Sequence, residues 1–221
     1  MDAQRLSIVV PALNEAPGIR AALEALAPLR ARGHEVVVVD GGSDDGTARL
    51  AGGLCDRILS AKKGRAVQMN AGAGVATGDV LLFLHADTRL PPQFAIPQSS
   101  VWGRFDVRIE GRHPLLKVVA WSMNLRSRLT GIATGDQAIF VRRDAFSGFA
   151  EIPLMEDVEF CRRMKRVAQP ACLREKVLTS GRRWESRGVL RTIVLMWRLR
   201  LMYFLGARPE RLSAIYDHRL R

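Results

Sequence analysis

One pair of polar residues in this sequence has the types and spacing needed to bind a metal. His85 and Asp87 follow the apolar run 80–84, with only Ala86 between them. If that run is a strand, alternate side chains point to the same face, and both residues reach one ion. A carboxylate and an imidazole suit a divalent metal that holds the diphosphate of a nucleotide. The alternative is that this triplet is simply the polar end of a strand.

A second pair, Glu156 and Asp157, stands directly before Val158, Cys161 and Met164. The spacing of these three residues predicts a helix, with both carboxylates in its first turn. The helix dipole favours acidic side chains at that position whatever their function. On its own, therefore, the pair indicates no more than the start of a helix.

The elements that position these residues alternate between strand and helix. The apolar runs 6–11, 35–39 and 80–84 predict buried strands, and the spacing of apolar residues in 19–29 predicts a helix between the first two. Strands without a wet face, joined by helices, predict a parallel sheet sandwiched by helices. Active sites of such sheets lie at the carboxyl ends of the strands.

Further elements are expected along the rest of the chain. Strands are predicted at 57–59, 101–109 and 138–141, and helices at 66–76 and 114–129. Within the second of these helices we expect Trp121 and Met123 to belong to the core. No linker or internal repeat divides the chain, so we expect one large domain.

Two loops offer groups for a nucleotide. Asp40 ends the second strand before Gly41-Gly42-Ser43, where it could accept hydrogen bonds from a base or ribose, although such a cluster is also a common turn. The basic segment 62–65 could hold phosphates or be a solvated loop. Neither a dinucleotide-binding fingerprint nor a Gly-Lys-Ser/Thr motif is present, which disfavours the dinucleotide and ATPase classes.

Composition and charge favour an anionic partner. The net charge of +12 lies entirely after residue 100, since residues 1–100 hold equal numbers of basic and acidic side chains. This asymmetry suggests a nucleic acid, a phosphorylated substrate or an acidic membrane as partner, or else a solvated basic face. The three cysteines are widely spaced, and the start of the chain, Met1 to Leu6, is too short for a signal segment before the first strand. Both features favour a reducing cytosol over secretion.

The most apolar stretch, 188–206, predicts a helix with Arg187, Arg191 and Arg198 on one stripe. Arginine at mid-bilayer is too costly for a spanning helix. The helix must therefore be covered by its own domain, by a second subunit or by lipid headgroups. Packing on the domain is the simplest of these.

Several weak signals occur in one order along the chain. They are the segments 7–15, 39–47 and 64–72, the strand ending in His85-Ala86-Asp87, and Met155-Glu156-Asp157. In this order they resemble the family-2 glycosyltransferases over residues 6–168. Two further segments, 102–106 and 183–185, resemble a compact, stand-alone bacterial branch of that family.

The resemblance implies a GT-A fold, a nucleotide-diphospho-sugar donor, Mg²⁺ or Mn²⁺, and inversion at the anomeric carbon. It implies that the donor nucleotide is lined by Pro11, Ala12, Asn14, Glu15, Asp40, Arg65 and Ala86. It assigns the metal to Asp87, with His85 beside it, and the catalytic base to Asp157. Glu156 would raise the pKa of that base through like-charge repulsion. We expect a catalytic domain over 1–180, and a basic, apolar helical extension over 181–221 packed on it.

Two departures from the family pattern bear on function. His85 stands where the family's Asp-x-Asp motif often has its first aspartate, which leaves the metal's identity open. Arg183-Trp184 match the end of the Gln-x-x-Arg-Trp motif of polymerising members, but Ser180 stands where that motif has its glutamine. Processive synthesis is therefore disfavoured. Two other classes remain as alternatives. They are a nucleotidyltransferase acting on a sugar phosphate and a non-catalytic basic module that binds a membrane or nucleic acid.

For the glycosyltransferase, the expected partners are the donor and an acceptor that the sequence does not identify, with a lipid-linked acceptor as one candidate. Nucleic acid is not expected. An anionic membrane surface and a second copy of the chain stay open. We expect a cytoplasmic protein, with the inner face of the membrane as its alternative place.

Overall fold

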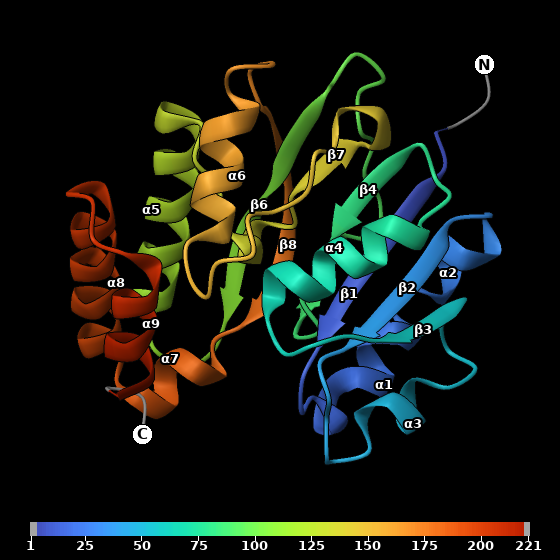
Figure 1. Cartoon of the computed structure of the whole chain (residues 1–221), viewed down its shortest axis with the longest axis horizontal. Helices are drawn as coiled ribbons and strands as arrows, with labels where there is room; N and C mark the ends of the chain where they lie inside the picture. Colours follow the sequence, from blue (N-terminus) through green and yellow to red (C-terminus); the bar gives the residue numbers. More distant parts are fainter. Residues whose placement is uncertain (1–3, 219–221) are drawn as a thin grey trace.

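The computed structural model describes residues 4–218, which fold around one mixed sheet (Figure 1). Its eight strands lie in the order β3-β2-β1-β4-β7-β6-β8-β5. The strands are β1 (Leu6–Ala12), β2 (Glu35–Asp40), β3 (Arg57–Ser60), β4 (Val80–Phe83), β5 (Thr88–Arg89), β6 (Trp102–Glu110), β7 (Phe140–Arg142) and β8 (Ala171–Ser180).

The half of the sheet from β3 to β4 is parallel, whereas the other half is mixed. β1 pairs in parallel with β2 and β4, and β2 pairs in parallel with β3. β7 runs antiparallel to its neighbours β4 and β6, while β6 and β8 are parallel. The edge strand β5 is antiparallel to β8. The predicted α/β class is confirmed, and parallel pairs outnumber antiparallel ones by four to three.

Helices cover both faces of the sheet. They are α1 (Ala16–Glu24), α2 (Ala27–Ala31), α3 (Thr47–Ala51), α4 (Arg65–Val75), α5 (Leu115–Thr130), α6 (Glu156–Met164), α7 (Arg182–Arg187), α8 (Val189–Phe204) and α9 (Pro209–His218), with 3₁₀ turns η1 (Gly135–Gln137) and η2 (Arg143–Ala145). Ile8 and Val10 face a core shared with α1, α2 and α5, whereas Val9 faces a second core shared with α4 and α6. Side chains alternate along a strand, so a strand between two cores must be apolar on both faces.

Helix α4 lies unusually close to the sheet. A Cβ atom at Gly72 would lie 2.5 Å from the side chain of Val9 and 2.9 Å from that of Val39. Only glycine fits at this contact, which fixes the height of the helix above β1 and β2. The helix α4 links the parallel strands β3 and β4, so its first residue, Arg65, lies where the parallel strands have their carboxyl ends. We call this side of the sheet the carboxyl edge.

The chain leaves the sheet at Ser180 and ends in α7, α8 and α9 (Figure 1, orange to red). Leu195 and Leu199 of α8 pack with Leu212 of α9 against Met155, the residue before α6. The opposite face of α8 remains exposed. Within residues 4–218, no helix combines the length and apolarity required to cross a bilayer.

Candidate active site

The loops that follow β1 and β2 form one side of the carboxyl edge and are tied to each other. The Asn14 N–H donates to the Ser43 hydroxyl at 2.9 Å, and the Asn14 side-chain oxygen accepts from the Asp44 N–H at 3.1 Å. The Glu15 N–H donates to the hydroxyl of Thr47 at 2.9 Å. Asn14 adopts a positive φ of 55°, a conformation that asparagine tolerates better than most residues. Through these contacts Asn14 joins the loop after β1 to the loop after β2.

Asp40 is buried, and its carboxylate holds its own loop. It accepts hydrogen bonds from the N–H groups of Gly42 and Ser43 at 3.0 and 2.9 Å, and from the Ser43 hydroxyl. Nearby, the backbone oxygen of Ala12 accepts from the buried amide of Gln68 at 2.8 Å. Pro11 and Ala12 are the last residues of β1 and therefore line the same edge.

Glu15 connects this edge to the C-terminal helices. Its carboxylate accepts a hydrogen bond of 3.0 Å from Arg183 and lies 3.6 Å from Arg182. The pKa of Glu15 is raised, mainly by burial, and the negative charge of Asp87 acts in the same direction against the two arginines. Glu15 and Asp87 are thus close enough to sense each other's charge.

The segment after β4 differs from the expected geometry. The strand ends at Phe83, and residues 84–87 enter a turn in which the Thr88 N–H donates to the His85 oxygen at 3.0 Å. The alternation of side chains along a strand therefore does not apply to His85 and Asp87. Ala86, between them, is buried.

The side chain of His85 points toward Asp136, a residue that was not predicted from the motifs to belong to the site. Its Nδ1 lies 3.3 Å from a carboxylate oxygen of Asp136. Its Nε2 is buried without a hydrogen-bond partner and faces Gly135, where a Cβ atom would lie only 2.4 Å away. Burial would raise the pKa of Asp136, but His85, Arg65 and Arg183 together hold it below its usual value.

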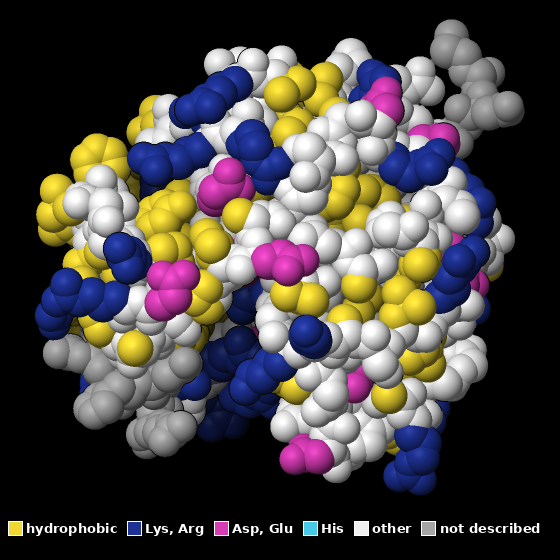
Figure 2. All heavy atoms as spheres, in the orientation of Figure 1, with side chains coloured by type: hydrophobic (Ala, Val, Ile, Leu, Met, Phe, Trp, Pro, Cys, Tyr) yellow, Lys and Arg dark blue, Asp and Glu magenta, His cyan; other side chains and the backbone are white. Residues whose placement is uncertain are grey.

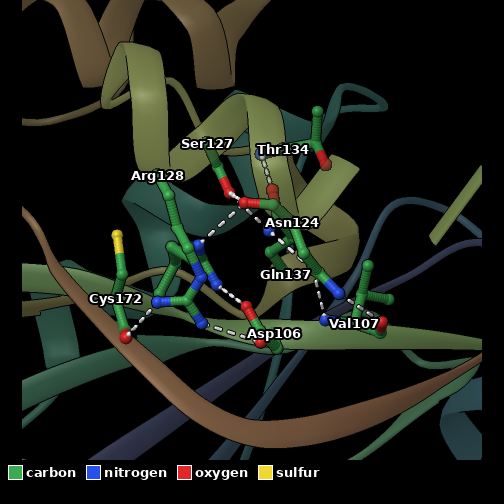
Figure 3. Close-up of polar contacts among 9 residues, drawn as sticks. Asp106, Val107, Asn124, Ser127, Arg128, Thr134, Gln137 and Cys172 are labelled. Carbon is green, nitrogen blue, oxygen red and sulfur yellow. Dashed lines mark hydrogen bonds and ion pairs between the residues drawn. The ribbon is translucent and has the colours of Figure 1, made fainter. Parts of the chain in front are cut away.

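The η1 turn that carries Asp136 is anchored from behind by α5. Gln137 is fully buried and donates to the Ser127 hydroxyl at 3.1 Å, while its side-chain oxygen accepts from the Thr134 N–H at 3.3 Å (Figure 3). Asn124 pairs with both backbone groups of Val107 on β6, at 2.8 and 3.0 Å. These contacts connect the turn to α5 and, through Asn124, to β6.

A buried ion pair beside the same edge completes this network. Asp106 of β6 contacts both Arg104 and Arg128. Arg128 also donates to the Cys172 oxygen of β8 at 3.1 Å, and Figure 3 shows Arg128 with Asp106 and Cys172. These contacts join β6, α5 and β8. A buried pair of this kind is costly to break, because removing one partner leaves an uncompensated charge.

The first turn of α6 places both predicted catalytic acids at the site. Glu156 is buried and accepts a hydrogen bond of 3.2 Å from Arg65. Asp157 is half-buried and accepts from the Gly135 N–H at 3.0 Å and from the Val158 N–H at 2.7 Å. Burial raises the pKa of Asp157 to about 6, with a further contribution from Glu156 and an opposing one from Arg65.

The charges at this edge alternate in sign. Burial alone would lower the pKa of Arg65, but Glu156, Asp136 and Asp157 outweigh it and raise that pKa. A second arginine, Arg126 of α5, also senses the charge of Asp157, and burial lowers its pKa. Two of its guanidinium nitrogens are buried without a partner. A half-buried carboxylate with a raised pKa, set among arginines, suits proton transfer beside an anionic substrate.

The side chains that could bind a metal can be compared with what the divalent cation implied by the motifs requires. Within residues 4–218, no three His, Cys, Asp or Glu side chains converge as a metal cage. Mg²⁺ and related ions, however, are usually held by one or two carboxylates together with substrate phosphates. Asp87, half-buried and near Glu15, fits that pattern. His85, with Nδ1 on Asp136 and Nε2 against Gly135, would have to turn before it could bind an ion.

Solved structures with TM-scores of 0.59 to 0.65 identify the fold of this chain. The mannosyltransferase PcManGT from Pyrobaculum calidifontis, in complex with GDP-Man and Mn²⁺, has a TM-score of 0.65 at 18% identity over 99% of this chain and 70% of its own. S. aureus TarS with UDP has a TM-score of 0.63 at 20% identity, over 80% and 60%. Glucosyl-3-phosphoglycerate synthase from Mycobacterium tuberculosis, with Mn²⁺ and UDP, has 0.59 at 17%, over 80% and 71%. The fold is that of the GT-A glycosyltransferases.

Sequence comparison then gives the family. Residues 7–99 match the model of Glycosyl transferase family 2. PGL/p-HBAD biosynthesis glycosyltransferases of Mycobacterium bovis and Mycobacterium tuberculosis are 38% identical over 97 residues, which is 41% of this chain. Over residues 7–99 the chain is therefore similar to glycosyl transferase family 2, in agreement with the resemblance of its motifs. The match spans 38% of the length of these curated relatives.

Proposed function

We propose that this chain transfers a sugar, with inversion, from a nucleotide-diphospho-sugar to an acceptor hydroxyl, assisted by a divalent cation. The observation that carries the proposal is Asp157, a half-buried carboxylate whose pKa is raised to about 6, at the carboxyl edge of the sheet. At neutral pH such a group is ionised and can accept a proton. The match of residues 7–99 to the family-2 model favours glycosyl transfer over the nucleotidyltransferase and non-catalytic alternatives.

The donor nucleotide is assigned to the loops after β1 and β2. Pro11 and Ala12 end β1, and Asn14 holds the second loop beside the first. Asp40 maintains the shape of that loop through its own backbone contacts, so its role toward the nucleotide is mainly positional. Arg65 and Ala86 line the far side of the same edge.

The cation is assigned to Asp87, with the donor diphosphate supplying further oxygen ligands. When bound, such an ion offsets the negative charge that develops on the departing diphosphate. Glu15 lies near Asp87 and is itself neutralised by Arg183 and Arg182. This arrangement leaves Asp87 as the acid available to an ion, while His85 orients Asp136.

Asp157 is assigned the proton of the acceptor hydroxyl. Its Oδ2 accepts from the Gly135 N–H, which orients the carboxylate, while the carboxylate of Glu156 accepts a hydrogen bond from Arg65. As the acceptor oxygen attacks the anomeric carbon, its proton passes to Asp157 and the bond from that carbon to the diphosphate breaks. Attack from the face opposite the leaving group inverts the anomeric configuration.

The acceptor and cellular place are part of the same proposal. We assign the chain to the cytoplasm, at the inner face of the membrane, with a lipid-linked acceptor. The support is the excess of positive charge after residue 100 and the exposed apolar face of α8. The division into a catalytic part, 1–180, and a helical extension, 181–221, remains a prediction.

The test is nucleotide release from a panel of UDP- and GDP-sugars, with and without Mn²⁺ and with and without a bacterial lipid extract. We expect one donor to be consumed, and Asp157→Asn to slow release by about 10²-fold or more. Asp144→Asn is the matched control, because that exposed acid pairs with Arg142 at the opposite edge of the sheet. Turnover of Asp157→Asn at the wild-type rate would contradict the proposal. Pyrophosphate release from a nucleoside triphosphate and a sugar phosphate would instead support nucleotidyl transfer.

A further inference from the structure

Helix α8 has an exposed apolar stripe opposite the face that it buries. Leu190, Val194, Trp197, Leu201 and Phe204 recur at helical spacing and are each between 58% and 73% exposed. Exposed large side chains are ordinary when scattered, but a continuous stripe marks an interaction surface. Figure 2 shows hydrophobic side chains gathered along the left side of the molecule, over α5 and α8, with Lys and Arg beside them.

Helix α5 extends this stripe into a surface. Val118, Trp121, Leu125 and Leu129 are exposed at the same spacing, and Trp121 is 64% exposed. The prediction that Trp121 belongs to the core is therefore wrong, whereas Met123 is buried as expected. The two helices are in contact, and we call the surface that carries their exposed stripes the α5–α8 face.

The charges on these two helices have one sign. Their sequences contain six basic residues and no acidic residue. Lys117, Arg191 and Arg198 are exposed beside the apolar stripes. A two-fold contact between copies of this face would bring like charges together. An anionic surface is the complementary partner.

A hollow lies at one end of the α5–α8 face, where both helices begin. Its volume is about 720 Å³, and its lining includes Arg112, His113, Leu190 and Arg191. The one acid of the lining, Glu185, accepts hydrogen bonds from the backbone of Arg112 and His113, at 2.6 and 2.9 Å. The hollow thus combines cationic side chains with an apolar wall, which suits a phosphate-bearing headgroup.

The buried face of α8 is directed at the candidate active site. Leu195 and Leu199 pack on Met155, which directly precedes Glu156 and Asp157. The exposed stripe therefore lies about one helix diameter, roughly 10 Å, from the chain segment that carries the proposed base. A surface that held the stripe would therefore lie close to the segment that carries Glu156 and Asp157.

We propose that the α5–α8 face docks on an anionic lipid bilayer. Trp121, Trp197 and Phe204 enter the interfacial region, where aromatic side chains are favoured, and Lys117, Arg191 and Arg198 contact acidic headgroups. This docking deepens the proposed function by naming the source of its acceptor, although binding to lipid does not itself require sugar transfer.

The experiment is co-sedimentation of the full chain with two kinds of vesicle. One kind is phosphatidylcholine alone, and the other contains equal amounts of phosphatidylcholine and phosphatidylglycerol. We expect binding to the anionic vesicles only, weakened by salt. Trp121→Ser/Trp197→Ser and Arg191→Glu/Arg198→Glu should each lower the partition coefficient at least about tenfold. Ile58→Ser and Arg32→Glu/Arg49→Glu are the matched controls, because these exposed residues lie at the other side of the sheet.

Equal binding to both vesicles, or unchanged binding by both sets of variants, would overturn the proposal. So would a dimer in sedimentation equilibrium without lipid that the tryptophan variants dissociate, because the face would then meet a second copy. Calorimetric titration with UDP and GDP keeps the two proposals apart. The α5–α8 variants should bind nucleotide as wild type does, and Asp87→Ala should bind vesicles as wild type does.

Discussion

The imidazole Nδ1 of His85 lies 3.3 Å from a carboxylate oxygen of Asp136, so a predicted metal ligand is held by an acid on a separate loop. The same loop donates the Gly135 N–H to Asp157 at 3.0 Å. One short turn, η1, therefore touches both the segment assigned to the metal and the proposed base. Anything that shifts this turn should disturb both.

Gly135→Ala tests that coupling. The new Cβ would lie 2.4 Å from the Nε2 atom of His85, so the imidazole must move. We expect the free energy of unfolding to fall by about 1–3 kcal/mol, as for overpacking elsewhere. The double variant Gly135→Ala/His85→Ala should recover about 1 kcal/mol or more relative to the sum of the single changes, measured by urea denaturation. Strict additivity would mean that the two residues do not collide. Gly18→Ala, with open space around it, is the control.

Protonation of Asp157 should cause the fall in kcat/KM at low pH, which is the acid limb of the pH profile. A base with a pKa of about 6 loses activity as the pH falls below that value, because the protonated carboxyl cannot accept a proton. The profile of kcat/KM should therefore rise with pH and level off above about 6. A profile that is flat from pH 5 to 8 would exclude Asp157 as the base.

The neighbours of Asp157 should move that limb in opposite directions. Glu156 raises the pKa of Asp157 and Arg65 lowers it, although burial is the larger cause. Glu156→Gln should shift the limb to lower pH, and Arg65→Gln should shift it to higher pH. A change in turnover without either shift would assign these two residues to substrate binding alone. The measurement is the apparent pKa of kcat/KM in each variant.

Much of this fold follows from the sequence because its first half obeys a simple pattern. The apolar runs 6–11, 35–39 and 80–84 correspond to β1, β2 and β4, and the polar loops after them form the site edge. The predicted helix 19–29 is divided into α1 and α2, since Pro28 occupies the first turn of a new helix. Because these three strands are parallel, their carboxyl ends lie on the same side of the sheet, and the sequence could therefore predict where the site lies.

Strand β8 escaped prediction for a physical reason. Its centre, Arg174-Glu175-Lys176, is exposed and charged, and the register with β6 shifts there, from Phe105 opposite Leu173 to Asp106 opposite Lys176. A bulge breaks the alternation on which strand recognition depends. The exposure of Trp121 could not be predicted from the sequence either, because an apolar stripe on a helix has the same spacing whether it faces a core or an external surface.

Asp136 was present in the sequence as Gly135-Asp136-Gln137 before a short buried strand. Its importance arises from tertiary contacts, since His85 lies 51 residues away along the chain. The one local signal was a polar triplet between two apolar segments, with a glycine able to accept close contact from a ring. Spacing alone gave no reason to prefer it over other turns.

Gly72→Ala should show how tightly α4 is held over the sheet. A Cβ atom at this position would meet Val9 at 2.5 Å and Val39 at 2.9 Å, both in the core. We expect a loss of about 1–3 kcal/mol in the free energy of unfolding. Gly74→Ala, in the same helix with nothing within 4 Å, should instead gain up to about 1 kcal/mol from helix propensity. Equal effects of the two changes would show that the helix can lift from the sheet without cost.

The metal-assisted donor site is tested most directly by isothermal titration of UDP and GDP into wild type and Asp87→Ala, each with and without Mn²⁺. We expect wild type to bind one of the two nucleotides more tightly with Mn²⁺, and Asp87→Ala to lose this gain in affinity. Asp144→Asn, altered at the opposite edge of the sheet, should keep it. If wild type and Asp87→Ala bind both nucleotides equally well whether or not Mn²⁺ is present, Asp87 does not hold a cation for the donor nucleotide.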